Sequence, residues 1–164
     1  MNEFKIKRAI ISVWDKEKIL PLARELVNNG VEIFSTGGTY KKLDQGGVQV
    51  SKISDLTDYP EILKGRVKTL HPVVFGGLLA DPDKKDHKSD LEKIGADFFQ
   101  LVIVNLYPFS KAFRNPDSQQ EEIIEMIDIG GPSMLRAAAK NYKNNIVISR
   151  SEEHTSELQS PSAI

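Results

Sequence analysis

Two nearly continuous apolar runs constrain the fold of this chain more than any other feature of its sequence. They are RAIISVW at residues 8–14 and FFQLVIVNL at residues 98–106. Such runs are typical of strands in a parallel sheet, where both faces of the strand are buried. Helical patterns alternate with the strands along the chain. The sequence therefore predicts an α/β fold, with a mostly parallel sheet flanked by helices.

The rest of the chain divides into short strand and helix patterns. Further strands are expected at residues 31–34, 48–53 and 145–149. Helices are expected from residues 15–16 to a stop at Gly30, over 40–43, within the charged segment 81–95, and at 119–127 and 132–142. Residues 54–72 are predicted to be irregular with a short helix near 61–63, and the glycines of VVFGGLLA at 73–80 fit either close packing or a strand bend.

Composition excludes several classes of protein. The 164 residues, enough for one domain with its own core, include no cysteine, which removes disulfides, thiolate metal sites and a cysteine nucleophile. No apolar run approaches the roughly 18 residues of a membrane span, and the N-terminal residues have no signal-peptide pattern. The net charge of −1 gives no indication of nucleic-acid binding. We therefore expect a cytoplasmic protein with no membrane and no nucleic-acid partner.

The last residues read as an addition to the natural sequence. RSEEHTSELQS at residues 150–160 resembles the translation of a common sequencing-adapter oligonucleotide, and PSAI would continue it. We expect a domain over residues 1–149, incomplete at its C-terminus, followed by a non-native tail at 150–164 in which His154 has no functional meaning. The alternative is a natural, disordered terminus.

Ligands of parallel sheets bind beyond the carboxyl ends of the strands, so the residues that follow each strand are the candidates for a site. After the second strand, STGGT at residues 35–39 combines two glycines, hydroxyls and a helix start. Glycines let the backbone approach an anion, and a helix N-terminus favours negative charge. This pattern predicts a phosphate site, with a plain tight turn as the alternative. After the first strand, Asp15 reads as a helix cap, whereas Lys16 is unfavourable at a helix start unless an anion is bound.

GRVKTLHP at residues 65–72 gathers several donors on a short stretch. Arg66 can fork onto a phosphate, carboxylate or carboxamide oxygen, and Lys68 can act as a point charge or, when desolvated, as a proton donor. In an extended conformation the two would share one face. His71 reads as a cap or packing residue or as a functional group. The other histidine before the tail, His87, lies in a charged segment, so no metal cluster is predicted.

Two polar residues lie at the end of the long strand at 98–106. Asn105 lies near the end of a strand that is expected to be buried. Burying its side-chain amide without a hydrogen-bond partner would be costly, so the side chain bonds either the backbone or a polar ligand. Tyr107 either packs against the domain or presents its hydroxyl to a ligand. The end of this strand is therefore a second candidate wall of a site.

The stretch DIGGPSMLRAAAKN at residues 128–141 adds an acid and a base. Asp128 precedes a glycine pair, and Pro132 suits the first position of the following helix. The alanines indicate close helix packing, so Lys140 is expected to be partly buried near Asp128. A buried lysine is suited to proton transfer.

Taken together, SVWDK, STGGT, GRVKTLHP, NLYPF and IDIGGPSMLRAAAKN resemble one family in order and spacing. This is the IMP cyclohydrolase domain of the bifunctional purine-biosynthesis family that pairs AICAR formyltransferase with IMP cyclohydrolase. The resemblance covers about residues 8–149. It implies a methylglyoxal-synthase-like fold and closure of FAICAR, 5-formamido-1-(5-phospho-ribosyl)imidazole-4-carboxamide, to IMP with loss of water. It also implies no metal and no cofactor for this step, a homodimer in the full-length protein, and a formyltransferase domain outside this chain.

The resemblance also implies roles for individual residues. Lys140 would donate and accept protons, assisted by Lys68, Tyr107 and Asp128. The nucleotide would be held by Ser12, Lys16, Thr36, Gly37, Gly38, Thr39, Arg66, Thr69, Asn105 and the backbone of Ile129. Trp14 lies where the family can have a small hydroxyl residue, which puts a phosphate contact of its side chain in doubt.

Two other functions on the same fold remain open at this point. Methylglyoxal synthase shares the phosphate loop but not RVKTLHP or the long D-I-G-G helix. A non-catalytic nucleotide-binding regulatory module would keep STGGT yet need neither Asp128 nor Lys140. A third outcome is an inactive fragment of the cyclohydrolase domain.

Overall fold

The computed structural model describes residues 4–149, and the predicted tail at 150–164 with His154 lies outside these described residues. Within them, five parallel strands form one sheet in the order β3-β2-β1-β4-β5. The strands are β1 (Arg8–Val13), β2 (Glu32–Ser35), β3 (Ser51–Lys52), β4 (Leu101–Asn105) and β5 (Ile146–Ile148). The predicted parallel sheet is therefore confirmed.

The two long apolar runs form the centre of the sheet. Ile10 of β1 pairs with Phe34 of β2 on one side and with Val102 of β4 on the other. Because successive strand side chains point to opposite faces, Ile11 joins one core cluster and Ile10 the other. Both side chains are fully buried. This double burial explains why the run lacks the alternation of a half-exposed strand.

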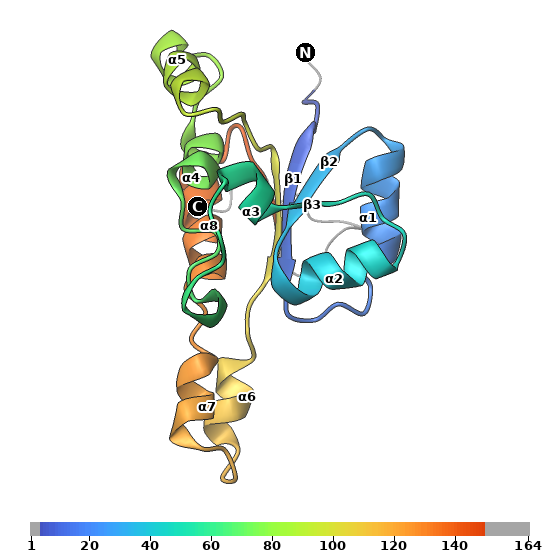
Figure 1. Cartoon of the computed structure of the whole chain (residues 1–164), viewed down its shortest axis with the longest axis vertical. Coiled ribbons are helices and arrows are strands. Elements are labelled where there is room, and N and C mark those ends of the chain that lie inside the picture. The colour runs from blue at the N-terminus through green and yellow to red at the C-terminus, as the bar shows by residue number, and fades with distance from the viewer. Residues whose placement is uncertain (1–3, 150–164) are drawn as a thin grey trace.

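Helices cover both faces of the sheet (Figure 1). One face carries α1 (Ile19–Asn28) and α2 (Gly37–Gln45), and the other carries α4 (Pro72–Leu79) and α8 (Gly130–Lys140). The shorter α3 (Ile53–Thr57) and α5 (Lys85–Lys93) lie on the side of α4. Beyond the carboxyl end of β4, α6 (Phe109–Arg114) and α7 (Gln120–Glu125) form a hairpin that projects from the body (Figure 1).

Several element boundaries differ from the prediction. The strand expected at 48–53 is only two residues long, because Ser51 and Lys52 pair with the last residues of β2 and the buried Ile53 already begins α3. The short helix near 61–63 is a 3₁₀ turn, η1 (Leu63–Gly65). The ambiguous segment 73–80 is the helix α4, in which Gly77 lies close to the chain that enters β4.

The last long helix also begins earlier than predicted. It starts at Gly130, because the carboxylate of Asp128 accepts a hydrogen bond from the amide of Gly131 at 2.9 Å. Pro132 is therefore the third helical residue, and the prediction that it occupies the first position was wrong. The short α6 was not predicted, because its residues have no periodic hydrophobic pattern.

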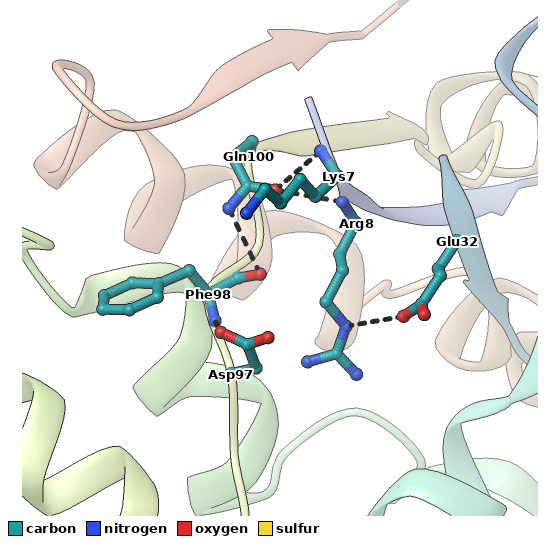
Figure 2. Close-up of polar contacts among 6 residues, drawn as sticks. All are labelled: Lys7, Arg8, Glu32, Asp97, Phe98 and Gln100. Atoms are coloured by element: carbon teal, nitrogen blue, oxygen red, sulfur yellow. Dashed lines mark hydrogen bonds and ion pairs between the residues drawn. The ribbon is translucent and has the colours of Figure 1, made fainter. Parts of the chain in front are cut away.

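The amino end of the sheet is closed by a polar cluster around Arg8 (Figure 2). The Arg8 guanidinium lies between the rings of Phe34 and Phe99, 4.5 and 4.9 Å from their centroids. Its Nε is 3.3 Å from a carboxylate oxygen of Glu32, and the side chain of Gln100 accepts the Arg8 amide hydrogen at 2.9 Å. Burial lowers the pKa of Arg8. These groups pair with one another and close this end of the sheet.

Candidate functional site

A cavity of about 500 Å³ lies at the carboxyl ends of β1, β2 and β4. The first turns of α2 and α8 form two of its walls, so backbone amides and two helix N-termini face one space. All the predicted site residues except Gly37 and Lys140 line it: Ser12, Lys16, Thr36, Gly38, Thr39, Arg66, Lys68, Thr69, Asn105, Tyr107, Asp128 and Ile129. The rule for parallel sheets therefore located the cavity correctly.

Two lysines meet the glycine pair at one end of the cavity. A Cβ on Gly38 would lie 3.3 Å from Cε of Lys16, and a Cβ on Gly37 would lie 3.0 Å from Nζ of Lys68. Both ammonium groups therefore flank the N-terminus of the nine-residue α2. Burial is the main cause that lowers the pKa of Lys16, and the nearby Asp15 opposes it. We name this part of the cavity, formed by these two lysines and the two glycines, the anion end.

Two hydroxyl groups near the anion end, those of Thr39 and Thr36, already have partners. Oγ1 of Thr39 donates to the carbonyl of Val13 at 2.9 Å and accepts from its amide at 3.1 Å, which fastens α2 to β1. Oγ1 of Thr36 donates to the carboxylate of Glu61 at 2.5 Å. Thr69 is buried against Gly130 at the start of α8. Thr39 and Thr69 thus help to build the walls of the cavity.

Asn105 bonds the backbone, one of the two alternatives left open by the sequence. Its side-chain oxygen accepts from the amides of Trp14 at 2.5 Å and Asp15 at 3.0 Å, and its NH₂ group donates to the carbonyl of Asp15 at 3.1 Å. Asp15 itself precedes α1 and accepts from the amide of Glu17, so it is not the cap of that helix. Asn105 therefore fixes the loop from which Lys16 reaches the anion end.

A phenol, a carboxylate and a guanidinium also line the cavity. Burial raises the pKa of Tyr107, and the negative charges of Asp128 and Glu125 raise it further, so the phenol holds its proton at neutral pH. One carboxylate oxygen of Asp128 accepts a hydrogen bond from the amide of Gly131. Arg66 forms an ion pair and hydrogen bond with Glu125 at the end of α7. We name this part of the cavity, formed by Arg66, Tyr107 and Asp128, the polar end.

Comparison with known proteins identifies the family. Residues 18–133 match the family model described as MGS-like domain.

The chain belongs to the MGS-like domain family.

Its similarity to individual proteins is high. It is 51% identical over 158 residues to the bifunctional purine biosynthesis protein PurH of Chlorobium phaeobacteroides (strain BS1), which covers 96% of this chain and 30% of that protein. It is 53% identical over 139 residues to PurH of Staphylococcus carnosus (strain TM300), which covers 85% and 28%. The crystal structure of ForH matches with a TM-score of 0.78 at 35% identity, over 94% of this chain and 79% of that one. The chain thus spans about 30% of the length of the curated relatives.

Two predicted site residues of this MGS-like domain do not line the cavity: Gly37, which is next to the lining residue Gly38, and Lys140. Lys140 is the last residue of α8, whose first residue, Gly130, lines the cavity. An 11-residue helix is about 15 Å long, which separates Lys140 from the polar end. Its side chain is exposed, so the expectation of a partly buried lysine near Asp128 was wrong. The proton-transfer role of Lys140 stays a prediction.

His71 and Trp14 take places that the sequence left open. Nδ1 of His71 accepts from the amide of Val73 at 3.2 Å, so His71 caps α4. Trp14 lines the cavity with its ring 4.8 Å from that of Tyr107, and its carbonyl accepts from Nζ of Lys16 at 2.7 Å. The Trp14 ring thus packs beside an aromatic ring, which agrees with the expectation that its side chain is a poor phosphate contact.

Two carboxylates of the site were not predicted. Glu61 contacts the anion end and Glu125 contacts the polar end. Glu125 is 59 positions from Arg66, and Glu61 is 25 positions from Thr36, so no local pattern connects them. Within residues 4–149, no group of three potential metal-ligating side chains is found, and no helix is long and apolar enough to cross a membrane.

Proposed function

We propose that this domain is an IMP cyclohydrolase, which closes FAICAR to IMP with loss of water. The observation that carries the proposal is a single cavity lined both by the cationic anion end and by the phenol, carboxylate and guanidinium of the polar end. A nucleotide has the matching polarity, with a phosphate at one end and a carboxamide-bearing base at the other. The roughly 50% identity to proteins named as purine biosynthesis enzymes supports this substrate class.

The reaction requires positioning and proton movement. The carboxamide nitrogen attacks the formyl carbon, a C–N bond forms, and the formyl oxygen leaves as water. Its two protons come from the carboxamide nitrogen and the formamide nitrogen. Holding two groups of one molecule in contact can supply roughly 7–11 kcal/mol of the barrier. A well-placed donor to the developing oxyanion supplies about 3–4 kcal/mol more.

The residues of the domain divide between these tasks. Lys16, Lys68 and the amides of Gly37 and Gly38 would hold the phosphate, since charge and a helix N-terminus coincide there. In the polar end, Arg66 would orient the carboxamide. The protonated phenol of Tyr107 and the carboxylate of Asp128 would then exchange protons with the reacting nitrogens and oxygen.

The proposal is tested by following purine-ring absorbance after FAICAR is added to the wild-type chain, against an enzyme-free blank. Asp128→Asn keeps an oxygen for the amide of Gly131 but removes the charge, so we expect at least a tenfold slower cyclisation from a folded protein. Glu92→Gln on α5 removes a charge outside the cavity and should leave the rate unchanged. An unchanged rate in Asp128→Asn would reject the role of Asp128, and no turnover by the wild-type chain would reject the function.

The same assay addresses the remaining expectations. Lys140→Ala should slow cyclisation only if Lys140 reaches the reacting atoms, and an unchanged rate would remove it from the mechanism. A chain ending at Ser149 should keep its rate if residues 150–164 are a non-native tail. Release of methylglyoxal from dihydroxyacetone phosphate would favour the synthase alternative, and IMP binding without turnover would favour a regulatory module.

A homodimer in the cytoplasm is part of the proposal. Exposed apolar side chains on and beside the α6–α7 hairpin, Phe113, Ile124 and Ile127, support self-association. Light scattering on the purified chain would give twice the monomer mass if this holds.

A further inference from the structure

The carboxylate of Glu61 contacts two side chains of the cavity wall. One of its oxygens accepts from Oγ1 of Thr36 at 2.5 Å, and the other lies 3.9 Å from Nζ of Lys68. Thr36 is the residue directly before α2, and Lys68 is one of the two lysines of the anion end. A negative charge of the protein therefore lies beside the groups that would bind a phosphate.

A hydroxyl group has one proton to donate. In this structure the Thr36 proton goes to Glu61, so Thr36 cannot donate to a bound anion while that bond is present. The same carboxylate draws the ammonium group of Lys68 toward itself. Glu61 and an incoming phosphate thus compete for the same proton donor and for the same cation.

The segment that carries Glu61 has an unusual backbone. Leu63 and Lys64 have positive φ angles of 52° and 54°, and Gly65 follows at 86°. Side chains other than glycine are disfavoured in this left-handed region, so two adjacent residues there make the segment costly to hold in place. Leu63 adds no packing, since it is 66% exposed. The contacts of Glu61 are therefore among those that hold the segment against the cavity.

We propose that Glu61 is a positioning residue that pairs with Thr36 and Lys68 beside the anion end as an internal competitor, and that a phosphate group displaces it from both when it binds. This rests on the proposed function only in taking the anion end as the phosphate site. Displacement releases the Thr36 hydroxyl for the ligand, and it lets the segment at 61–65 move with Lys68. Affinity for phosphate is thereby kept lower than the lysines and the helix N-terminus would give alone.

The experiment measures binding of inorganic phosphate and of IMP by calorimetry to the wild-type chain, Glu61→Gln and the control Glu92→Gln. Glu61→Gln removes a like charge next to the anion, so we expect both probes to bind about five- to tenfold more tightly. Glu92→Gln makes the same chemical change on α5 and should bind as the wild type does. Equal or weaker phosphate binding by Glu61→Gln would overturn the inference.

A second measurement separates competition from a structural role. Thr36→Val should weaken phosphate binding more in the Glu61→Gln background than in the wild type. In the wild type the Thr36 hydroxyl must give up its bond to the Glu61 carboxylate before it bonds the ligand, so the lost bond offsets part of the gained one. Equal losses in both backgrounds would contradict the proposal. The outcomes also separate it from the enzymatic function. If Glu61→Gln binds phosphate more tightly but the wild-type chain does not turn over FAICAR, the enzymatic function is rejected and the inference about Glu61 stands. If the chain turns over FAICAR but Glu61→Gln does not bind phosphate more tightly, the inference is rejected and the function stands.

Discussion

At the scale of single residues, Gly65 controls where Lys68 lies. Its φ angle is 86°, and a Cβ there would come within 2.2 Å of Cε and 2.8 Å of Nζ of Lys68. The lysine stem therefore crosses the space that any other residue would fill. The absence of a side chain at position 65 lets Nζ reach the glycine pair of α2.

We predict that Gly65→Ala weakens phosphate binding about tenfold, because the new methyl group displaces an ammonium group whose contact with an anion is worth a charge-assisted hydrogen bond. Backbone strain should also lower stability by about 1 kcal/mol. Gly95→Ala is the matched control, since Gly95 has a φ of 64° and open space around its Cβ position. It should show the same loss of stability with unchanged phosphate binding. Equal phosphate affinities of the two variants would refute the prediction.

For single residues, the sequence predicted residue types better than contact partners. The residue types of the anion end were predicted from three short stretches, SVWDK, STGGT and GRVKTLHP, because each combines its charged or small residues with a local helix or turn signal. The sequence could not predict whether Asn105 bonds a ligand or the backbone, because its backbone partners lie 90 and 91 positions away. Lys140 was misplaced for a different reason. Asp128 precedes α8 and Lys140 ends it, so the length of the helix keeps the two apart, and the predicted bounds of that helix already implied this separation.

At the scale of elements, the α4 helix packs on the entrance of β4 through a glycine. A Cβ on Gly77 would lie 2.4 Å from the carbonyl oxygen of Asp97 and 2.8 Å from the Phe99 ring. The amide of Phe99 also donates to the carbonyl of Gly77 at 2.9 Å. Close packing, one of the two alternatives for VVFGGLLA, therefore explains this glycine.

We predict that Gly77→Ala lowers the free energy of unfolding by about 1–3 kcal/mol, since the clash involves a backbone oxygen that cannot turn away. Gly76→Ala is the neighbouring control. Its methyl group would meet only the ends of the Leu91 and Ile94 side chains, at 3.1 and 3.4 Å, and the better helix propensity of alanine offsets that contact. Urea unfolding curves of the wild type, Gly77→Ala and Gly76→Ala would measure the three free energies of unfolding. A loss in Gly76→Ala as large as that in Gly77→Ala would count against the argument.

Elements with a strong hydrophobic pattern were predicted well, and weak ones were not. β1 and β4 are continuous apolar runs, and their burial between two layers of helices leaves little choice of structure. β3 and α6 are too short to have a period, so tertiary contacts decide them. α8 starts two residues before the predicted boundary, where the Asp128 side chain accepts a hydrogen bond from the amide of Gly131.

At the scale of the whole molecule, the α6–α7 hairpin stands apart from the sheet and its helices (Figure 1). The ion pair between Arg66 and Glu125 joins it to the segment that carries the donors of the cavity. The hydrogen bond from Arg66 is the main cause that holds the pKa of Glu125 below its usual 4.5. The carboxylate is therefore more acidic in the folded protein than in the unfolded chain. The contribution of the pair is present above pH 4.5 and is lost as the pH falls through the lowered value.

We predict that Glu125→Gln speeds amide hydrogen exchange in residues 109–125 at neutral pH, because the hairpin loses its charged contact with Arg66. Glu121→Gln removes the same charge from the same helix and leaves the pair intact, so its exchange should match the wild type. In the wild-type protein, the protection factors of the hairpin amides, which remove the intrinsic pH dependence of exchange, should hold at pH 4.5 and fall at more acidic pH, whereas Glu125→Gln should lack this step. If both variants exchange alike, or if the step persists in Glu125→Gln, the pair does not hold the hairpin.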